Sequence, residues 1–137
     1  MVRWQFRNYV QPGGKNRVRE WYWSLSTKER AKLDRLVMIL ERQMQWSMPH
    51  FKSLSGKHAG LSEIRWNGNQ NKQLRLLGYR GPVLWQYTFL LGCSHKGDRY
   101  TPTNALDTAA LHLKNLSQGI GDTCEHESEI DSEPEEE

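Results

Sequence analysis

Three apolar segments between Leu61 and Cys93 are separated only by short polar turns, and this feature limits the fold more than any other. The segments cover residues 61–66, 72–79 and 83–93, and the turns between them read NGNQN and RGP. Asn, Gly and Pro are typical of tight turns, and short turns connect antiparallel strands. We therefore expect a three-stranded antiparallel meander.

The residues before this meander predict one strand and two helices. Apolar and polar residues alternate over residues 2–6, which is typical of a strand with one buried face. Apolar residues then recur at helical spacing over residues 18–25. Ser26 and Glu29 have the spacing of a capping box, which predicts the start of a second helix. That helix should end before Pro49, because proline disfavours a helical conformation in the residue preceding it.

A last helix should follow the meander. Thr101 is suited to cap it and Pro102 to occupy its first turn, and apolar residues from Ala105 to Leu116 supply a buried face. The resulting order is strand, two helices, three strands and a helix. It predicts an α+β domain with its helices against one face of a small, twisted antiparallel sheet that is mixed at its edge.

Charge divides the chain into two parts. Residues 1–121 carry all 19 Lys and Arg against seven acids, a net charge of +12, whereas residues 122–137 carry nine acids and no Lys or Arg. A strongly basic body favours a polyanionic partner. The acidic segment has low apolar content, so we expect a folded domain over residues 1–118 and a disordered tail over residues 119–137.

Several classes of protein and site are not expected. Cys93 and Cys124 form no disulfide framework, which favours a reducing cytoplasm. No apolar run approaches the roughly 18 residues of a membrane helix, and the N-terminal residues do not resemble a signal peptide. The histidines lack the usual zinc-ligand spacings, and no phosphate-binding glycine loop is present. We therefore expect no metal, no cofactor and no membrane partner.

Cations on the expected strands and their turns are the strongest functional signal. Any one of them is an ordinary solvated side chain, but together they could grip phosphate groups or stabilise charge that develops on a phosphodiester. Arginine suits this role because its planar guanidinium binds two phosphate oxygens at once. The cations concerned are Lys52, Lys57, Arg65, Arg75, Arg80, Lys96 and Arg99, with His58 and His95 beside them.

His95 is the best candidate for acid–base chemistry, since histidine titrates near neutral pH. An ordinary surface histidine is the alternative. Trp66, at a strand end, and Tyr100 could stack on nucleic-acid bases.

The order of several short motifs resembles the RelE/ParE toxin superfamily, and most closely the HigB-like, phage-derived toxins of type II toxin–antitoxin systems. These motifs are VREWYWSLS, PHFKSLSG, GLSEIRW, KQLRLLGY, TFLLGCSHKGDRYTP and NALDTAALHL, and they cover residues 2–116. The resemblance implies a RelE-like fold and metal-independent cleavage of messenger RNA, often on the ribosome. It also implies a cognate antitoxin, typically with a helix-turn-helix domain.

The resemblance implies catalytic roles for four cations, with His95 beside the last of them: Lys52, Arg65, Arg75 and Lys96. We expect these four to converge in one positively charged pocket, and Lys57, His58, Trp66, Arg80, Arg99 and Tyr100 to bind RNA around it. The chain departs from the family pattern in the final strand. Relatives often carry Phe-x-Lys-Lys before the Thr-Pro pair, whereas residues 94–97 here read SHKG.

Two other functions stay open at this point. One is inhibition of DNA gyrase by protein contact, as on the ParE side of the superfamily. The other is an inactive module that binds nucleic acid or antitoxin. A further hypothesis concerns the tail: Glu125–Glu137 folds back over the basic face and competes with RNA, or else it only improves solubility.

Overall fold

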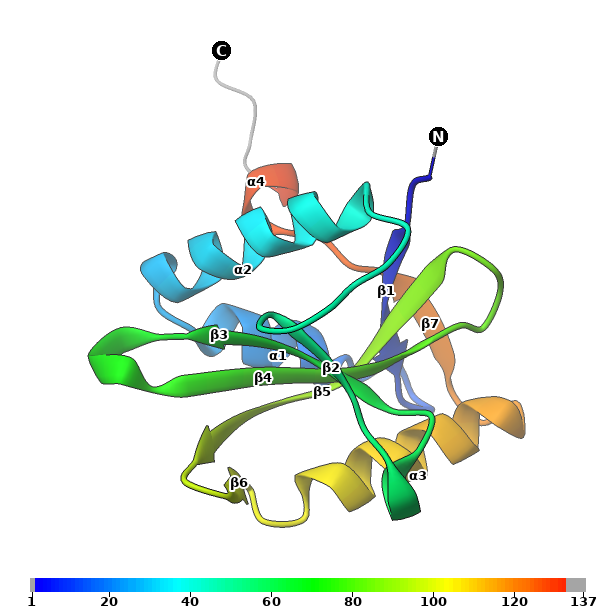
Figure 1. Ribbon diagram of the computed structural model, residues 1–137. Helices are drawn as coiled ribbons and strands as arrows, with labels where there is room; N and C mark the ends of the chain where they lie inside the picture. Colours follow the sequence, from blue (N-terminus) through cyan, green and yellow to red (C-terminus); the bar gives the residue numbers. More distant parts are fainter. Residues whose placement is uncertain (1, 133–137) are drawn as a thin grey trace.

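The computed structural model describes residues 2–132 (Figure 1); Met1 and residues 133–137 lie outside the described part of the chain. Two short 3₁₀ turns, Gly56–His58 and Asn69–Asn71, accompany its helices and strands. The helices and strands are, in chain order, β1 (Gln5–Val10), α1 (Arg17–Ser24), α2 (Thr27–Glu41), β2 (Phe51–Ser53), β3 (Ser62–Asn67), β4 (Gln73–Arg80), β5 (Gln86–Lys96), β6 (Arg99–Thr101), α3 (Ala105–Ser117), β7 (Asp122–Glu125) and α4 (Glu129–Ser132).

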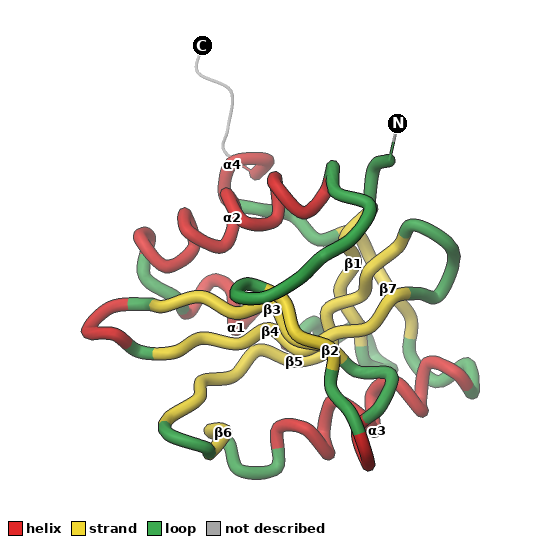
Figure 2. The backbone as a smooth tube through the Cα atoms, in the orientation of Figure 1, coloured by secondary structure: helices red, strands yellow, loops and turns green. Residues whose placement is uncertain are grey.

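The strands form one open, mixed sheet (Figure 2). Its order is β2-β3-β4-β5-β1-β7, with β6 paired to β5. β1 runs parallel to β5, and the other pairs are antiparallel. The expected meander is present as β3, β4 and β5, and the α+β class is confirmed. The sheet has seven strands and is therefore larger than the small sheet expected, because β2, β6 and β7 were not foreseen as separate strands.

Helices cover both faces of the sheet, so the expectation that they share one face is wrong. Figure 1 shows α2 and α4 on one side and α3 on the other. The adjacent residues Leu76 and Leu77 of β4 explain this arrangement, since both are almost fully buried, with 1% and 0% exposed. Successive strand residues point to opposite faces. Leu76 accordingly packs in the core beneath α1 and α2, and Leu77 packs in the core beneath α3.

The capping box at the start of α2 is confirmed. The Ser26 hydroxyl accepts a hydrogen bond from the Glu29 backbone N–H (3.1 Å), and the Glu29 carboxylate accepts one from the Ser26 N–H (3.0 Å). The other Glu29 oxygen accepts from the Asn69 N–H (3.0 Å), which ties α2 to the turn between β3 and β4. The start of α3 differs from the expectation: its N-cap is Asn104, and Thr101 belongs to β6.

The expectation of a disordered tail is wrong for residues 122–132. β7 pairs with β1, and the buried ring of His126 shares a hydrogen bond with Asn8 (Nδ1 to Oδ1, 2.9 Å). Glu129 in turn forms an ion pair with Arg30 of α2 (3.2 Å). Backbone hydrogen bonds and a few buried contacts hold this segment in place. The expectation of disorder rested on its low apolar content, which does not predict such contacts.

The position of this segment bears on the two expectations made for the tail. Residues 122–132 pack on the domain formed by the rest of the chain instead of standing apart from it. β7 is the edge strand farthest from β2 and β3, so this part does not fold back over the cations of those strands. The rest of the proposed tail, residues 133–137, lies outside the described residues. No helix in the described part of the chain is long and apolar enough to cross a membrane.

Candidate functional site

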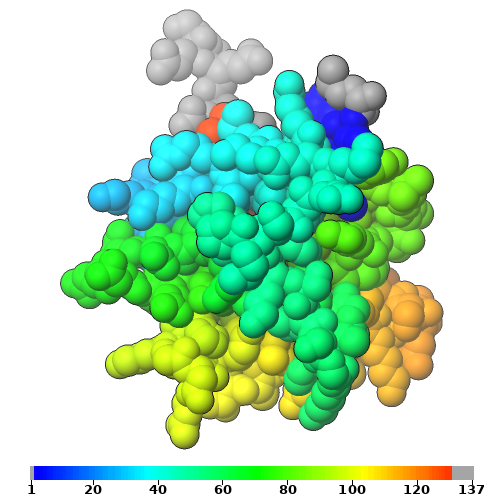
Figure 3. Space-filling model, viewed as in Figure 1, coloured from blue at the N-terminus to red at the C-terminus, as the bar shows by residue number. Residues whose placement is uncertain are grey.

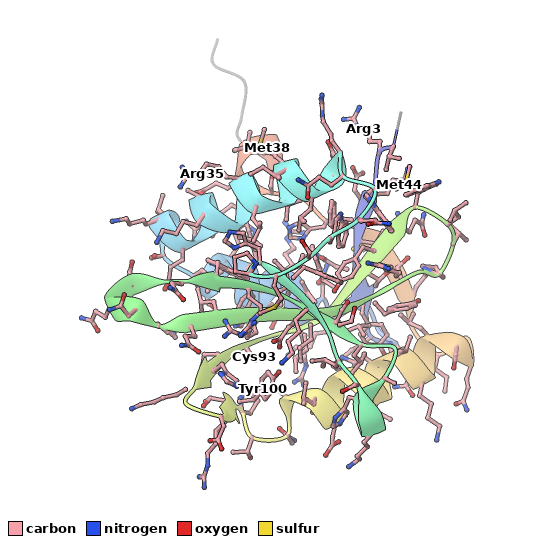
Figure 4. The ribbon with its side chains drawn as sticks, in the orientation of Figure 1. Arg3, Arg35, Met38, Met44, Cys93 and Tyr100 are labelled. Atoms are coloured by element: carbon pink, nitrogen blue, oxygen red, sulfur yellow. The ribbon has the colours of Figure 1, made fainter. Side chains whose placement is uncertain are left out.

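Strand pairing brings polar side chains from β3, β4, β5 and β6 together on one face of the sheet. Arg65 lies opposite Arg75, Gln73 opposite His95, and His95 opposite Tyr100. Residues directly opposite each other in a sheet point to the same face. Figure 4 shows Cys93 and Tyr100 on the side of the sheet that faces α3.

Glu63 lies at the centre of this group. Its Oε1 is 3.4 Å from Arg65 Nε and 3.7 Å from Arg75 Nε, and its Oε2 accepts a hydrogen bond from the Tyr100 hydroxyl (2.7 Å). The Glu63 and Arg75 side chains are only 3% and 5% exposed, whereas Arg65 is 24% exposed. We name these residues, together with Gln73 and His95, the Glu63 cluster: Glu63, Arg65, Gln73, Arg75, His95 and Tyr100.

Gln73 connects Arg75 to His95 and favours one tautomer of the imidazole. Its Oε1 accepts from an Arg75 terminal nitrogen (3.2 Å) and lies 3.3 Å from His95 Nδ1. Because that oxygen only accepts, this contact favours the neutral tautomer with its proton on Nδ1. Nε2 is then the unprotonated nitrogen, which makes it a proton acceptor.

Burial and neighbouring charges shift the acid–base equilibria of the cluster. Partial burial and, next, the positive charge of Arg75 lower the pKa of His95, so the imidazole is neutral at pH 7. Burial and then the hydrogen bond to Glu63 raise the pKa of Tyr100, which keeps its hydroxyl protonated. Burial lowers the pKa of Arg75, and the nearby positive charge of Arg65 lowers it further.

Cys93, opposite Arg75 in the sheet, is not suited to be a nucleophile. The residue is 2% exposed, and burial, followed by the negative charge of Glu63, raises the pKa of its thiol to about 12. A thiol needs its thiolate form to attack. His95, whose pKa is lowered, is the better candidate for acid–base chemistry on this face.

The cluster has a net positive formal charge, because two guanidinium groups share one carboxylate. Arg65 is the more exposed of the two arginines, so its guanidinium is the one that solvent and ligands can reach. Arg75, held by Glu63 and by the backbone carbonyl of Leu74 (2.9 Å), supplies fixed charge from beneath. Such an arrangement suits a phosphate group with a proton acceptor beside it.

The four cations expected to converge do so in part. Arg65 and Arg75 meet at Glu63, and Lys52 of β2 lies opposite Glu63 with an exposed side chain. Lys96 follows His95 on β5, and strand alternation places its side chain on the other face. The expectation of a single pocket that includes Lys96 is therefore wrong.

The residues expected to bind RNA are distributed over several places. Lys57 and His58 both contact Asp107 in the first turn of α3, at 3.3 Å and 2.9 Å. Arg80 is at the other end of β4 from Gln73, and its guanidinium lies over the ring of Phe51 (5.4 Å).

Three further residues of that set differ in accessibility. Arg99 is exposed on β6. Tyr100 belongs to the Glu63 cluster, and Trp66 is buried on the opposite face of β3. Trp66 is therefore not an open stacking platform.

Glu63 and Gln73 were missed from the sequence. A single acid among cations is typical of an exposed ion pair, and a glutamine in a strand carries no signal of its own. The signal that could have found them is the two-residue spacing Glu63–Arg65 and Gln73–Arg75 on adjacent antiparallel strands, which places all four side chains on one face.

The described residues contain no group of three or more His, Cys, Asp or Glu side chains placed to hold a metal ion. Comparison of the chain with protein-family models, curated proteins and solved structures finds no match.

Proposed function

We propose that the protein is a metal-independent endoribonuclease with a RelE-like fold, the toxin of a type II toxin–antitoxin system. The observation that carries this proposal is the Glu63 cluster, in which His95 and the guanidinium groups of Arg65 and Arg75 lie on one face of the sheet. The basic body of the chain and its motif resemblance to HigB-like toxins support the same proposal.

The proposed reaction uses the RNA itself as the nucleophile. His95 Nε2 removes the proton from a ribose 2′-hydroxyl, whose oxygen attacks the adjacent phosphorus. The bond between phosphorus and the 5′ oxygen breaks, and that oxygen takes a proton from water. The hydroxide left behind takes the proton from His95, which restores the neutral imidazole. The products are a 2′,3′-cyclic phosphate and a 5′-hydroxyl end, so the reaction requires neither a metal nor a covalent enzyme intermediate.

Arg65 and Arg75 stabilise the charge that builds on the phosphate oxygens during attack. Arg65 contacts the phosphate, while Arg75 acts through its fixed charge and by positioning His95 through Gln73. Glu63 is a positioning residue, because its buried carboxylate orients both arginines and Tyr100. Lys52 is placed to contact RNA beside the cluster, and Lys96 is outside the proposed catalytic set.

The implied partners are messenger RNA, either free or on the ribosome, and a small helix-turn-helix antitoxin. Induction of the chain in bacteria tests this proposal. The expected result is growth arrest with cut transcripts, relieved by co-expression of the protein encoded next to it. Arrest with broken or abnormally supercoiled DNA would instead indicate a gyrase inhibitor and overturn the proposal.

A second candidate function is a binding module without catalysis. The burial of Glu63 and Arg75 favours it, because an arginine that is 4% exposed has little access to a substrate. Induction without growth arrest, together with retained binding to RNA, would select this function. The distinction therefore depends on cleavage and not on affinity.

A further inference from the structure

A groove adjoins the Glu63 cluster at the edge of β3. It has a volume of about 830 Å³ and lies between α2, the segment that follows α2, and strands β3 and β4. Figure 3 shows the segment that follows α2 (teal) crossing the surface between α2 and the residues of β2. The volume is within the range of roughly 300–1,000 Å³ that is typical of ligand sites.

The groove connects the two faces of the sheet. Its α2 wall, which includes Arg35, belongs to one face, whereas Arg65 and Arg75 reach it from the face that carries the Glu63 cluster. Figure 4 shows Arg35 on α2, on the other side of the sheet from Tyr100. A ligand bound at Arg65 can therefore extend around the β3 edge into the groove.

The charge of the groove favours an anion. Lys32 and Arg35 line its α2 wall, Arg65 and Arg75 line its strand wall, and no acid is present among the described residues that line it. Arg35 is exposed, and Lys32 is held over the end of β3 by a hydrogen bond from Nζ to the Asn67 carbonyl (3.2 Å). Arg35 and Arg65 present accessible guanidinium groups, which suit phosphate oxygens, and the buried Arg75 adds positive charge from beneath.

Apolar side chains accompany these cations. Ile39 and Met48 line the groove, and they are 56% and 58% exposed. Exposed apolar atoms between cations provide a surface against which unpaired nucleic-acid bases can pack while their phosphates meet the charged rim.

We propose that the groove binds the strand of single-stranded RNA that flanks the cleaved bond, with phosphates on Lys32 and Arg35 and bases against Ile39 and Met48. This inference rests on the proposed function, since the Glu63 cluster would hold the scissile phosphate. Single-stranded nucleic acid is favoured over an acidic peptide because the groove is continuous with the residues proposed to hold a phosphodiester.

Binding of a labelled 2′-O-methyl RNA oligonucleotide tests the proposal, because the blocked nucleophile prevents cleavage. Fluorescence anisotropy at several salt concentrations gives the dissociation constant and its salt dependence. The double variant Lys32→Gln/Arg35→Gln should bind more weakly. Its salt slope should be flatter by about 1.4, or about 0.7 for each lost phosphate contact to a single strand. The control Lys28→Gln/Lys114→Gln removes two exposed cations outside the groove and should bind like the unaltered protein.

Three outcomes separate the two proposals. If the unaltered protein cleaves no RNA but the groove variants bind the oligonucleotide more weakly than the control, the proposed function fails and the groove proposal stands. If the groove variants and the control bind RNA equally well, the groove proposal is overturned. It is also overturned if the groove variants bind a synthetic acidic amphipathic peptide more weakly than the control does but bind the RNA oligonucleotide equally well.

Discussion

Glu63 of β3 and Arg75 of β4 are diagonal neighbours on one face of the sheet, with Oε1 and Nε 3.7 Å apart and 3% and 5% of their side chains exposed. The same carboxylate also forms an ion pair with Arg65 and accepts a hydrogen bond from the Tyr100 hydroxyl. A buried charge is tolerated only when it is paired. The Glu63–Arg75 pair is therefore both a structural requirement of the sheet and the support of the proposed active site.

Replacing Glu63 with Ala should destabilise the protein strongly. The change leaves the Arg75 guanidinium buried without its counter-charge, which costs about 3–5 kcal/mol. Urea denaturation followed by circular dichroism measures the free energy of unfolding. Glu127→Ala removes an exposed acid and should change it by less than about 0.5 kcal/mol. Equal effects of the two substitutions would show that the Glu63 carboxylate does not hold Arg75.

Replacing Arg65 should impair cleavage more than folding. Arg65 is partly exposed, so Arg65→Ala should lower the rate by about 10²–10³-fold, as expected for loss of one group that stabilises the transition state. Arg65→Lys should restore only part of the rate, because an ammonium group cannot bind two phosphate oxygens in a fixed plane. Single-turnover cleavage of a labelled RNA measures both rates.

Lys96→Ala tests whether the strand geometry or the family resemblance gives the correct role for Lys96. The resemblance implies a catalytic lysine at this position, whereas strand alternation places Lys96 away from His95. We expect the Lys96→Ala protein to cleave RNA at nearly the unaltered rate. A loss as large as that of Arg65→Ala would mean that the β5–β6 hairpin rearranges when RNA binds.

The pH dependence of cleavage should report His95. Its pKa is lowered by burial and by Arg75, so the imidazole becomes neutral at a lower pH than an ordinary histidine. Activity should therefore rise with pH through a pKa below 6.5 and remain constant at neutral pH. In His95→Gln the residual activity should lose this rise. Persistence of the same rise in that variant would assign the titration to another group.

The segment after α3 should contribute to stability. His126→Ala removes the partner of the buried Asn8 side chain and should lower the free energy of unfolding by about 1–3 kcal/mol. Ile130→Ala, at a residue that is 57% exposed, provides a comparison in the same segment and should have little effect. An unchanged unfolding free energy in His126→Ala would indicate that the segment detaches from β1 in solution.

Much of the fold could be predicted because local patterns determine it. The capping box of Ser26 and Glu29 and the turns of the meander depend on neighbouring residues, and the structure contains both. The placement of α3 on the second face could not be predicted in this way. It depends on burial of both Leu76 and Leu77, and adjacent apolar residues do not reveal which helix covers which face. Segment 122–132 was missed because its stability comes from pairing with β1, 112 or more residues earlier in the chain.

The candidate site was predictable only as a set of strand cations. Arg65, Arg75 and His95 do meet, because the strand register aligns them. The sequence could not indicate that Arg75 is buried or that Glu63 lies between the two arginines, since both facts depend on how far each side chain is covered. The groove was not predictable either, because its walls come from α2 and β3, which pack together only in the folded chain.

The most direct test of the central claim is incubation of the purified protein with a labelled RNA oligonucleotide in the presence of EDTA. The account predicts a cut that leaves a 2′,3′-cyclic phosphate, is blocked by a single 2′-deoxy substitution at the cut position, and is slower by about 10²–10⁴-fold in His95→Gln. Cleavage that survives both changes would contradict the proposed chemistry. Absence of any cut, with or without ribosomes, would contradict the proposed activity.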